Sequence, residues 1–251
     1  MTDIAYVGAG VLGSAVGMDK ALFKDVMRAN NIPVLPSLTL TRRQVSQLSN
    51  PLLEQVEKLA PYPLFTKPAN LGSSVGITKC RSRADLVEGL LEAARFDRRI
   101  LVERGLDNPR EIEISVLGNE TPQASLPGEI VPSDDFYSYK AKYIDGRSAL
   151  IIPAELSPRV TTDLRETAKK VYQVIDCSGM ARVDYLMDRV DHSVFVSEVN
   201  TIPGFTSISM YPKLWEASGL SYAALIDRLI ELALERKAER DHTERHFGSA
   251  S

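Results

Sequence analysis

The chain has 251 residues, enough for one large domain or two smaller ones, and its 44% hydrophobic and 25% charged content is ordinary for a globular protein with a core. The net charge of -3, with both signs interspersed, argues against a nucleic-acid partner. No apolar run approaches the ~20 residues of a membrane span and no signal peptide is recognisable, so we expect no membrane contact and a cytoplasmic location. Cys80 and Cys177 are far apart without metal-type spacing and are expected to be reduced thiols.

The first part of the chain predicts a small α+β block. Residues 1–17 are expected to form a short strand and a glycine-rich turn. The elements expected next are a helix from about residue 19, an extended run at 34–40, a helix capped by Thr41 with Gln44, strands at 63–68 and 75–79, a helix capped by Ser82, and a strand at 100–103.

The second part predicts another α+β block. Its expected elements are strands at 112–117 and 123–130, an aromatic loop at 132–145, an extended run at 149–152, a helix opening at Ser157-Pro158, strands at 180–187 and 194–199, and an amphipathic helix from about residue 221. The chain beyond residue 237 is charged and expected to fray.

A Gly/Ser-rich loop at 72–76 follows the predicted strand that ends in Lys67-Pro68. Small residues let backbone N–H groups approach an anion, and Lys67 places a cation beside the loop. The alternative is a plain hairpin with a flexible turn, which is the commoner structure for a Gly/Ser-rich loop considered by itself. The motif is not a P-loop, because no Lys-Ser/Thr pair follows its second glycine.

Polar side chains alternate on the two predicted strands near the C-terminal end. Arg182 and Asp184 lie two apart on one strand, and Glu198 and Asn200 lie two apart on the next. If the strands pair as a hairpin, two carboxylates and an amide oxygen share one face, which suits Mg²⁺ or Mn²⁺. The alternative is a solvated polar face. We favour the metal site because the opposite face is apolar.

Two further lysines are ambiguous from the residues alone. Lys142 belongs to an aromatic run at 136–143, which fits either a mobile lid or an exposed edge strand. Lys20 follows Asp19 at a helix start and reads as a surface lysine.

These motifs occur in an order that resembles the D-alanine–D-alanine ligases of the ATP-grasp superfamily, from about Tyr6 to about Glu235. In chain order they are Met-Asp-Lys at 18–20, Lys-Pro and Gly-Ser-Ser-Val-Gly at 67–76, Glu103, Arg-Glu-Ile-Glu at 110–113, an aromatic run ending in Ala-Lys-Tyr at 141–143, Ala-Arg-Val-Asp at 181–184, Glu-x-Asn-Thr-x-Pro-Gly from 198, and Met-Tyr-Pro at 210–212.

The resemblance implies an ATP-grasp fold of the α+β or α/β class, in which two α+β subdomains grip ATP. The implied domains are the end of an N-terminal domain at 1–17, a small subdomain at 18–103, a C-terminal catalytic subdomain at 104–237 and a charged tail at 238–251. Family members begin with an α/β domain that binds the first D-alanine and through which they often dimerise. This chain is therefore expected to lack most of that domain, and a homodimer is the implied assembly.

The implied activity is ATP-dependent joining of two D-alanines through a D-alanyl phosphate, for peptidoglycan precursor synthesis. One alternative is a non-catalytic ATP/Mg²⁺-binding fragment that needs the N-terminal domain. Another is a different ATP-grasp carboxylate–amine ligase, such as a D-alanine–D-lactate ligase. Tyr143 favours D-alanine as the second substrate, because the resemblance associates Phe at that position with D-lactate.

The resemblance also implies a role for each site residue. For ATP, Lys20 and Lys67 contact the α- and β-phosphates, Ser74 belongs to the phosphate loop, Glu103, Arg104 and Leu106 hold adenine, Glu111 lies near the ribose, and Phe136 and Lys142 close from the lid. Two Mg²⁺ (or Mn²⁺) ions are implied on Asp184, Glu198 and Asn200. For catalysis, Arg182 and the backbone N–H of Gly204 stabilise the tetrahedral intermediate, Ser209 and Met210 bind the second D-alanine, and Ser73 and Tyr143 lock the lid.

Overall fold

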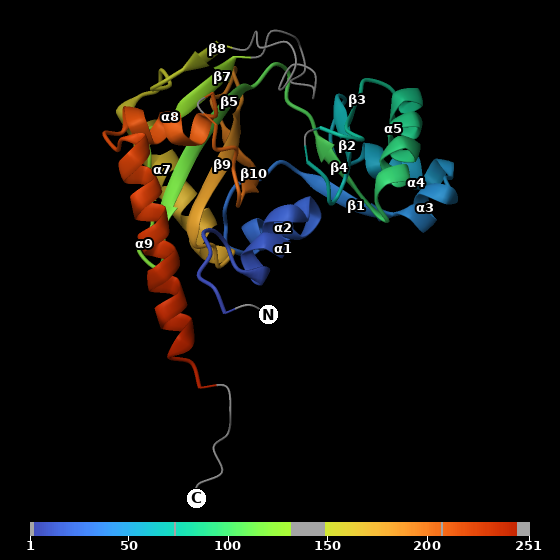
Figure 1. The fold of residues 1–251 in the computed structure, drawn as a ribbon. Helices are drawn as coiled ribbons and strands as arrows, with labels where there is room; N and C mark the ends of the chain where they lie inside the picture. The colour runs from blue at the N-terminus through green and yellow to red at the C-terminus, as the bar shows by residue number, and fades with distance from the viewer. Residues whose placement is uncertain (1–2, 73, 132–148, 207, 245–251) are drawn as a thin grey trace, which may run out of the picture.

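The computed structural model describes residues 3–72, 74–131, 149–206 and 208–244, which form two antiparallel sheets with covering helices (Figure 1). The first elements are α1 (Val11–Met18), α2 (Lys20–Ala29), β1 (Ser37–Thr41), α3 (Arg42–Ser46), α4 (Asn50–Glu57), β2 (Leu64–Pro68), β3 (Thr78–Cys80), α5 (Arg83–Phe96) and β4 (Arg99–Arg104). The later elements are β5 (Arg110–Gly118), β6 (Gln123–Ala124), β7 (Gly128–Val131), β8 (Ala149–Ile151), α7 (Pro158–Val174), β9 (Gly179–Met187), β10 (Val194–Asn200), α8 (Met210–Ala217) and α9 (Tyr222–Asp241).

The smaller sheet has the strand order β1-β4-β2-β3 and presents two different faces. Leu64, Ile100 and Val102 point to one face, where they form a core with residues of α3, α4 and α5. Alternation along the strands directs Phe65, Lys67, Leu101 and Glu103 to the other face. That second face carries charged groups and is directed toward the larger sheet.

The larger sheet runs β10-β9-β5-β7-β8, with β6 paired to β5. Ile114 and Val183 share a core with α7 on one face. Leu117 and Met180 share a core with α8 and α9 on the other face. Because alternate residues of a strand share a face, Glu113 on β5 and Asp184 on β9 lie on the face covered by α8 and α9.

Helix α2 packs into the core of the larger sheet, although the smaller sheet follows it in the chain. Phe23 and Met27 are fully buried in that core together with Ile114. Ala21 contacts the smaller sheet through Ala69 and Leu101, and Figure 1 shows α2 between the two sheets. The packing therefore groups α2 with the larger sheet, whereas the resemblance placed it in the small subdomain; the domain bounds themselves stay a prediction.

Helix signals in the sequence were mostly reliable. Thr41 and Gln44 form the expected capping box, Ser82 accepts from the Asp85 N–H, and Ser157 caps α7 with Pro158 in its first turn. The prediction for residues 1–17 was wrong, because residues 11–17 form most of α1. Gly13 in this helix allows close packing against the backbone of Asp176 and does not form a turn. A Cβ at Gly13 would lie 2.9 Å from the Asp176 carbonyl oxygen.

No helix in the described ranges is both long and apolar enough to cross a membrane. The aromatic loop predicted at 132–145 lies outside the described residues.

Candidate functional site

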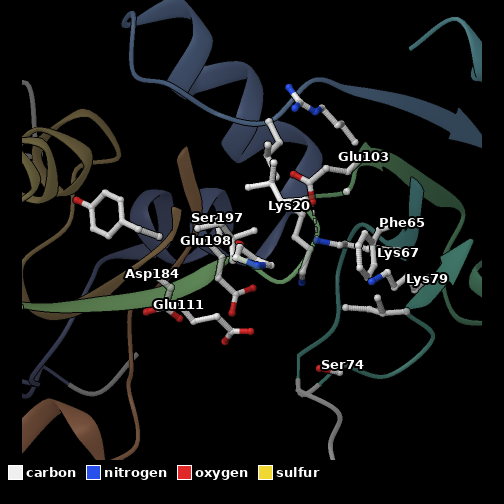
Figure 2. A pocket seen from close by; sticks show the side chains of 18 of the residues that line it. Lys20, Phe65, Lys67, Ser74, Lys79, Glu103, Glu111, Asp184, Ser197 and Glu198 are labelled. Carbon is white, nitrogen blue, oxygen red and sulfur yellow. Dashed lines mark hydrogen bonds and ion pairs between the residues drawn. The ribbon is translucent and has the colours of Figure 1, made fainter. Parts of the chain in front are cut away.

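A cavity of about 460 Å³ lies between the two sheets and is lined by residues of both. Figure 2 shows Lys20, Lys67, Lys79 and Glu103 on one side, and Glu111, Asp184 and Glu198 on the other. Cations therefore line the wall on the side of the smaller sheet, and carboxylates line the facing wall.

The start of α2 fixes Lys20 beside the Gly/Ser loop. Asp19 caps the helix by accepting from the Leu22 N–H, and it forms an ion pair with Arg99 at 2.6 Å. The Lys20 ammonium donates to the Leu71 carbonyl at 2.5 Å, and its backbone N–H donates to the Ala69 carbonyl. Lys20 is therefore a cavity residue, and the surface-lysine reading is wrong.

Ser74 also lines the cavity. It has φ +60°, a conformation that short polar residues tolerate better than most. Gly76 has φ +68°, and a Cβ there would lie 2.8 Å from the Pro68 ring. Residues 74–76 therefore form a turn with two positive-φ positions, which fits the anion-binding prediction.

Glu103 is the most buried charged group of this wall, at 2% exposure. Its Oε2 lies 2.5 Å from the Lys67 ammonium, and its Oε1 forms an ion pair with Lys24. Burial by itself would raise the pKa of Glu103, but Lys24 and Lys67 outweigh burial and bring the pKa down to about 2. The carboxylate is thus ionised and already occupied by two cations.

Backbone and apolar groups form part of the cavity lining. Arg104, Gly105 and Leu106 line the cavity after β4, and the Gly105 N–H donates to the Pro63 carbonyl at 2.8 Å. A Cβ on Gly105 would lie 2.7 Å from that carbonyl oxygen, so the close approach requires glycine. Apolar side chains that line the cavity include Leu35, Phe65, Ile112 and Leu186. The cavity therefore combines apolar lining with charged groups, as small-molecule sites commonly do.

Two carboxylates of the facing wall contact Arg182, which does not itself line the cavity. The Arg182 guanidinium contacts Asp184 with two nitrogens, at 2.7 and 2.8 Å, and Glu113 at 2.9 Å. Asn200 also donates to Asp184, at 2.9 Å. Burial would lower the pKa of Arg182, but the Asp184 and Glu113 carboxylates outweigh it and raise the pKa above its ordinary value.

The hairpin prediction is confirmed by the strand register. Glu198 pairs with Asp184, and Asn200 pairs with Arg182, across the antiparallel β9–β10 ladder. Residues directly opposite each other point to the same face. The expected donors therefore share one face, as predicted.

The donor chemistry suits a hard divalent cation, because carboxylate and amide oxygens are what such ions prefer. Asp184 nevertheless contacts Arg182 and accepts a hydrogen bond from Asn200. Within the described part of the chain, no group of three His, Cys, Asp or Glu side chains converges on a metal position. A cation bound there would lie next to the contact between Asp184 and Arg182.

Five predicted residues that the structure describes are not among those that line the cavity: Arg182, Asn200, Gly204, Ser209 and Met210. Gly204 is exposed, and Ser209 Oγ accepts from the Thr206 N–H at 3.0 Å. Met210 is buried in a core with Leu214, so its side chain packs instead of facing the cavity. Four predicted residues lie outside the described residues: Ser73, Phe136, Lys142 and Tyr143.

Sequence reasoning missed several charged residues of the site, among them Arg189, which lines the cavity. Lys79 lines the cavity, Glu113 contacts Arg182, and Lys24 pairs with Glu103. Two of them had a usable signal: Lys24 follows Lys20 by one helical turn, and Glu113 follows Glu111 by two strand positions.

Two solved structures share this architecture. The D-alanine–D-alanine ligase from Coxiella burnetii matches with a TM-score of 0.79 and 41% identity, over 95% of this chain and 63% of that one. A D-Ala:D-Ser ligase from Enterococcus faecalis matches with a TM-score of 0.80 and 33% identity, over 90% of this chain and 64% of that one. The fold and the cavity thus define a protein of the ATP-grasp ligase class, which confirms the predicted fold.

The family follows from sequence comparison. A family model described as the D-ala D-ala ligase C-terminus matches residues 26–231. D-alanine–D-alanine ligases from Heliobacterium modesticaldum and Thermoanaerobacter sp. are 48% and 51% identical over 97% and 96% of this chain, and the chain covers 67% and 66% of them. The chain belongs to the D-alanine–D-alanine ligase family, and it spans about two thirds of the length of these relatives.

Proposed function

We propose that this chain carries the ATP-binding and bond-forming machinery for joining two D-alanines into D-alanyl-D-alanine, a peptidoglycan precursor. The observation that carries the proposal is the cavity, where lysines on one wall face carboxylates on the other. Such a site suits a nucleoside triphosphate, whose phosphates need cations from the protein and whose divalent metal needs oxygen ligands.

Apolar side chains of the cavity and the chain after β4 would hold the adenine. Leu106, Ile112 and Leu186 line the cavity and can supply apolar contact, and the backbone around Arg104 can meet the base edge. Glu111 lines the cavity on the wall of Asp184 and Glu198 and would meet ribose hydroxyls. Apolar walls with a few placed polar groups are the usual design of a small-molecule site.

Lys20, Lys67 and the loop at Ser74 would hold the phosphates, because they bring positive charge and backbone N–H groups to the same end of the cavity. Asp184, Glu198 and Asn200 would hold the divalent cation, Mg²⁺ or Mn²⁺, with two ions as the family pattern has it. A bound cation supplies neutralisation of charge on the phosphate oxygens.

The chemistry has two steps. A carboxylate oxygen of the first D-alanine attacks the γ-phosphorus of ATP, and ADP leaves. The amine of the second D-alanine then attacks the carbonyl of the acyl phosphate, loses a proton, and phosphate leaves. Arg182 would stabilise the negative charge on the tetrahedral intermediate together with the backbone N–H of Gly204.

The remaining roles come from the family pattern. Ser209 and Met210 would meet the carboxylate of the second D-alanine. Because the Met210 side chain is buried, that contact would use backbone groups at the start of α8. Ser73, Phe136, Lys142 and Tyr143 would close over the site and exclude water.

The test is turnover of the purified chain with ATP, MgCl₂ and D-alanine. We expect ADP and D-alanyl-D-alanine in equal amounts by coupled assay and mass spectrometry, and no dipeptide with L-alanine. Nucleotide affinity is measured separately by calorimetry. ATP binding without turnover would refute the activity of this chain by itself, whereas absence of ATP binding would refute the assignment of the cavity.

Specificity for the second substrate has its own test. D-alanine and D-lactate are supplied together near neutral pH, and the products are separated by mass spectrometry. We expect the dipeptide to predominate, because Tyr143 is the residue associated with it. Predominant formation of the ester would refute this part of the proposal.

A further inference from the structure

Lys24 on α2 is fully buried beside the cavity, with 2% of its side chain exposed. It lies one helical turn after Lys20, but its ammonium contacts Oε1 of Glu103. The other carboxylate oxygen, Oε2, contacts Lys67, which is 16% exposed and lines the cavity. One buried carboxylate is therefore shared by a buried lysine and a cavity lysine.

The charges of these three groups sum to +1. Glu103 contributes one negative charge, and each protonated lysine contributes one positive charge. Burial lowers the pKa of Lys24, and the ion pair with Glu103 opposes that shift. If Lys24 were neutral, Glu103 and Lys67 would form a neutral pair at the cavity wall. The surplus positive charge that Lys67 presents to the cavity thus depends on the residue behind it.

The geometry also fixes the position of Lys67. Its ammonium is held by Glu103 at 2.5 Å and lies 5.7 Å from the centre of the Phe65 ring. Glu103 is held in turn from the side of α2, a helix packed into the core of the larger sheet. Lys24 therefore connects the charged groups at the cavity wall to a helix that is packed into the core of the larger sheet.

We propose that Lys24 is a positioning residue for nucleotide phosphates, which neutralises Glu103 so that Lys67 presents an uncompensated positive charge to the cavity. The inference rests on the proposed nucleotide-binding function and assigns a role to a residue that does not touch the ligand. A purely structural alternative is that the Lys24–Glu103 pair only attaches α2 to β4.

The two readings differ in which part of the ligand loses affinity. Loss of a structural attachment would weaken adenosine and ATP alike, because the whole cavity would loosen. Loss of the surplus charge would weaken ATP and leave adenosine bound as before. The discriminating quantity is the ratio of the ATP affinity to the adenosine affinity.

The experiment measures both affinities by calorimetry at constant Mg²⁺ for the wild type and for Lys24→Met, Lys24→Gln and Lys24→Arg. We expect the ratio to fall at least about tenfold in the Met and Gln variants, since one unit charge a few Å from a phosphate changes affinity by more than that at an effective dielectric of about 20. The Arg variant should keep the ratio within about threefold, because it keeps the charge.

Arg28→Met is the matched control. It also removes a positive charge from α2, one turn after Lys24, but Arg28 is 40% exposed and pairs with Asp25. Its ratio should equal that of the wild type.

The double variant Lys24→Met/Glu103→Gln tests the mechanism. It leaves Lys67 with an uncompensated charge, so the ratio should return toward the wild-type value even if both affinities fall. Equal losses of ATP and adenosine affinity in the single variants, or no recovery in the double variant, would overturn the inference. If Lys24→Met fails to fold, Lys24→Gln and the double variant carry the same comparison. A wild type that binds ATP no better than adenosine would overturn the proposed function itself.

Discussion

Replacing Glu103 with glutamine should lower stability in a pH-dependent way. The folded protein holds the pKa of Glu103 at about 2, whereas its ordinary value is 4.5. Each tenfold change in an acid dissociation constant is worth about 1.4 kcal/mol, so the ionised carboxylate contributes about 3 kcal/mol near neutral pH. Because the folded-state pKa is the lower one, this contribution is complete well above pH 4.5 and is lost as the pH falls toward 2.

The assay is urea unfolding of the wild type and Glu103→Gln between pH 7 and pH 3. We expect the stability difference to be about 3 kcal/mol at pH 7 and to shrink by about 1 kcal/mol at pH 4 and about 2 kcal/mol at pH 3. Glu92→Gln is the control, because Glu92 forms a surface pair with Arg95 and should cost less than about 0.5 kcal/mol at any pH. A stability difference that stays constant between pH 7 and pH 3 would refute the reasoning.

Three further changes test the rest of the structure. Arg182→Met removes the cation shared by Glu113 and Asp184 and should lower the free energy of unfolding in urea by about 3–5 kcal/mol. Adding Asp184→Asn should recover part of that loss, and a loss below about 1 kcal/mol would contradict the buried network. Asp184→Asn alone should reduce Mg²⁺-dependent ADP formation at least about a hundredfold, equivalent to about 3 kcal/mol, while the circular dichroism spectrum stays unchanged; unaltered turnover would remove Asp184 from the site. Gly179→Ala places a Cβ 2.8 Å from the backbone nitrogen of Gly8 at φ +73° and should cost about 1–3 kcal/mol; a thermal midpoint equal to that of the wild type would show that the N-terminal segment moves aside.

The parts of the fold that depend on local chemistry could be predicted from the sequence. Side chains near in sequence decide a helix cap, so Thr41 and Ser157 marked their helices correctly. The hairpin was predictable for the same reason, because strand alternation alone places Asp184 and Glu198 on one face.

Elements that depend on tertiary packing were missed. The α4 and α8 helices were not predicted, and α8 contains Pro212, which disfavours a helix from sequence alone. The burial of Tyr211 and Trp215 against the larger sheet stabilises α8 instead.

The site residues show the same difference between local sequence motifs and tertiary packing. Lys67 and Asp184 were found because each belongs to a compact motif. Lys24 was missed because a lysine on a helix is ordinarily solvated, and only the partner on β4 accounts for its burial. Met210 was assigned to substrate, but the structure places its side chain in the core under β7, where the lack of a Cβ on Gly128 leaves room for it.

The position of α2 makes the smaller sheet a topological insertion. Helices α1 and α2 contribute to the core of the larger sheet, the chain then builds the smaller sheet from β1 to β4, and it returns to the first core at β5. During synthesis the smaller sheet has all its strands and its own core before β5 emerges. We therefore expect it to fold first, while Phe23 and Met27 stay exposed until β9 and α7 follow. The apolar face of α2 is then the surface that stays exposed longest and to which a chaperone could bind during synthesis.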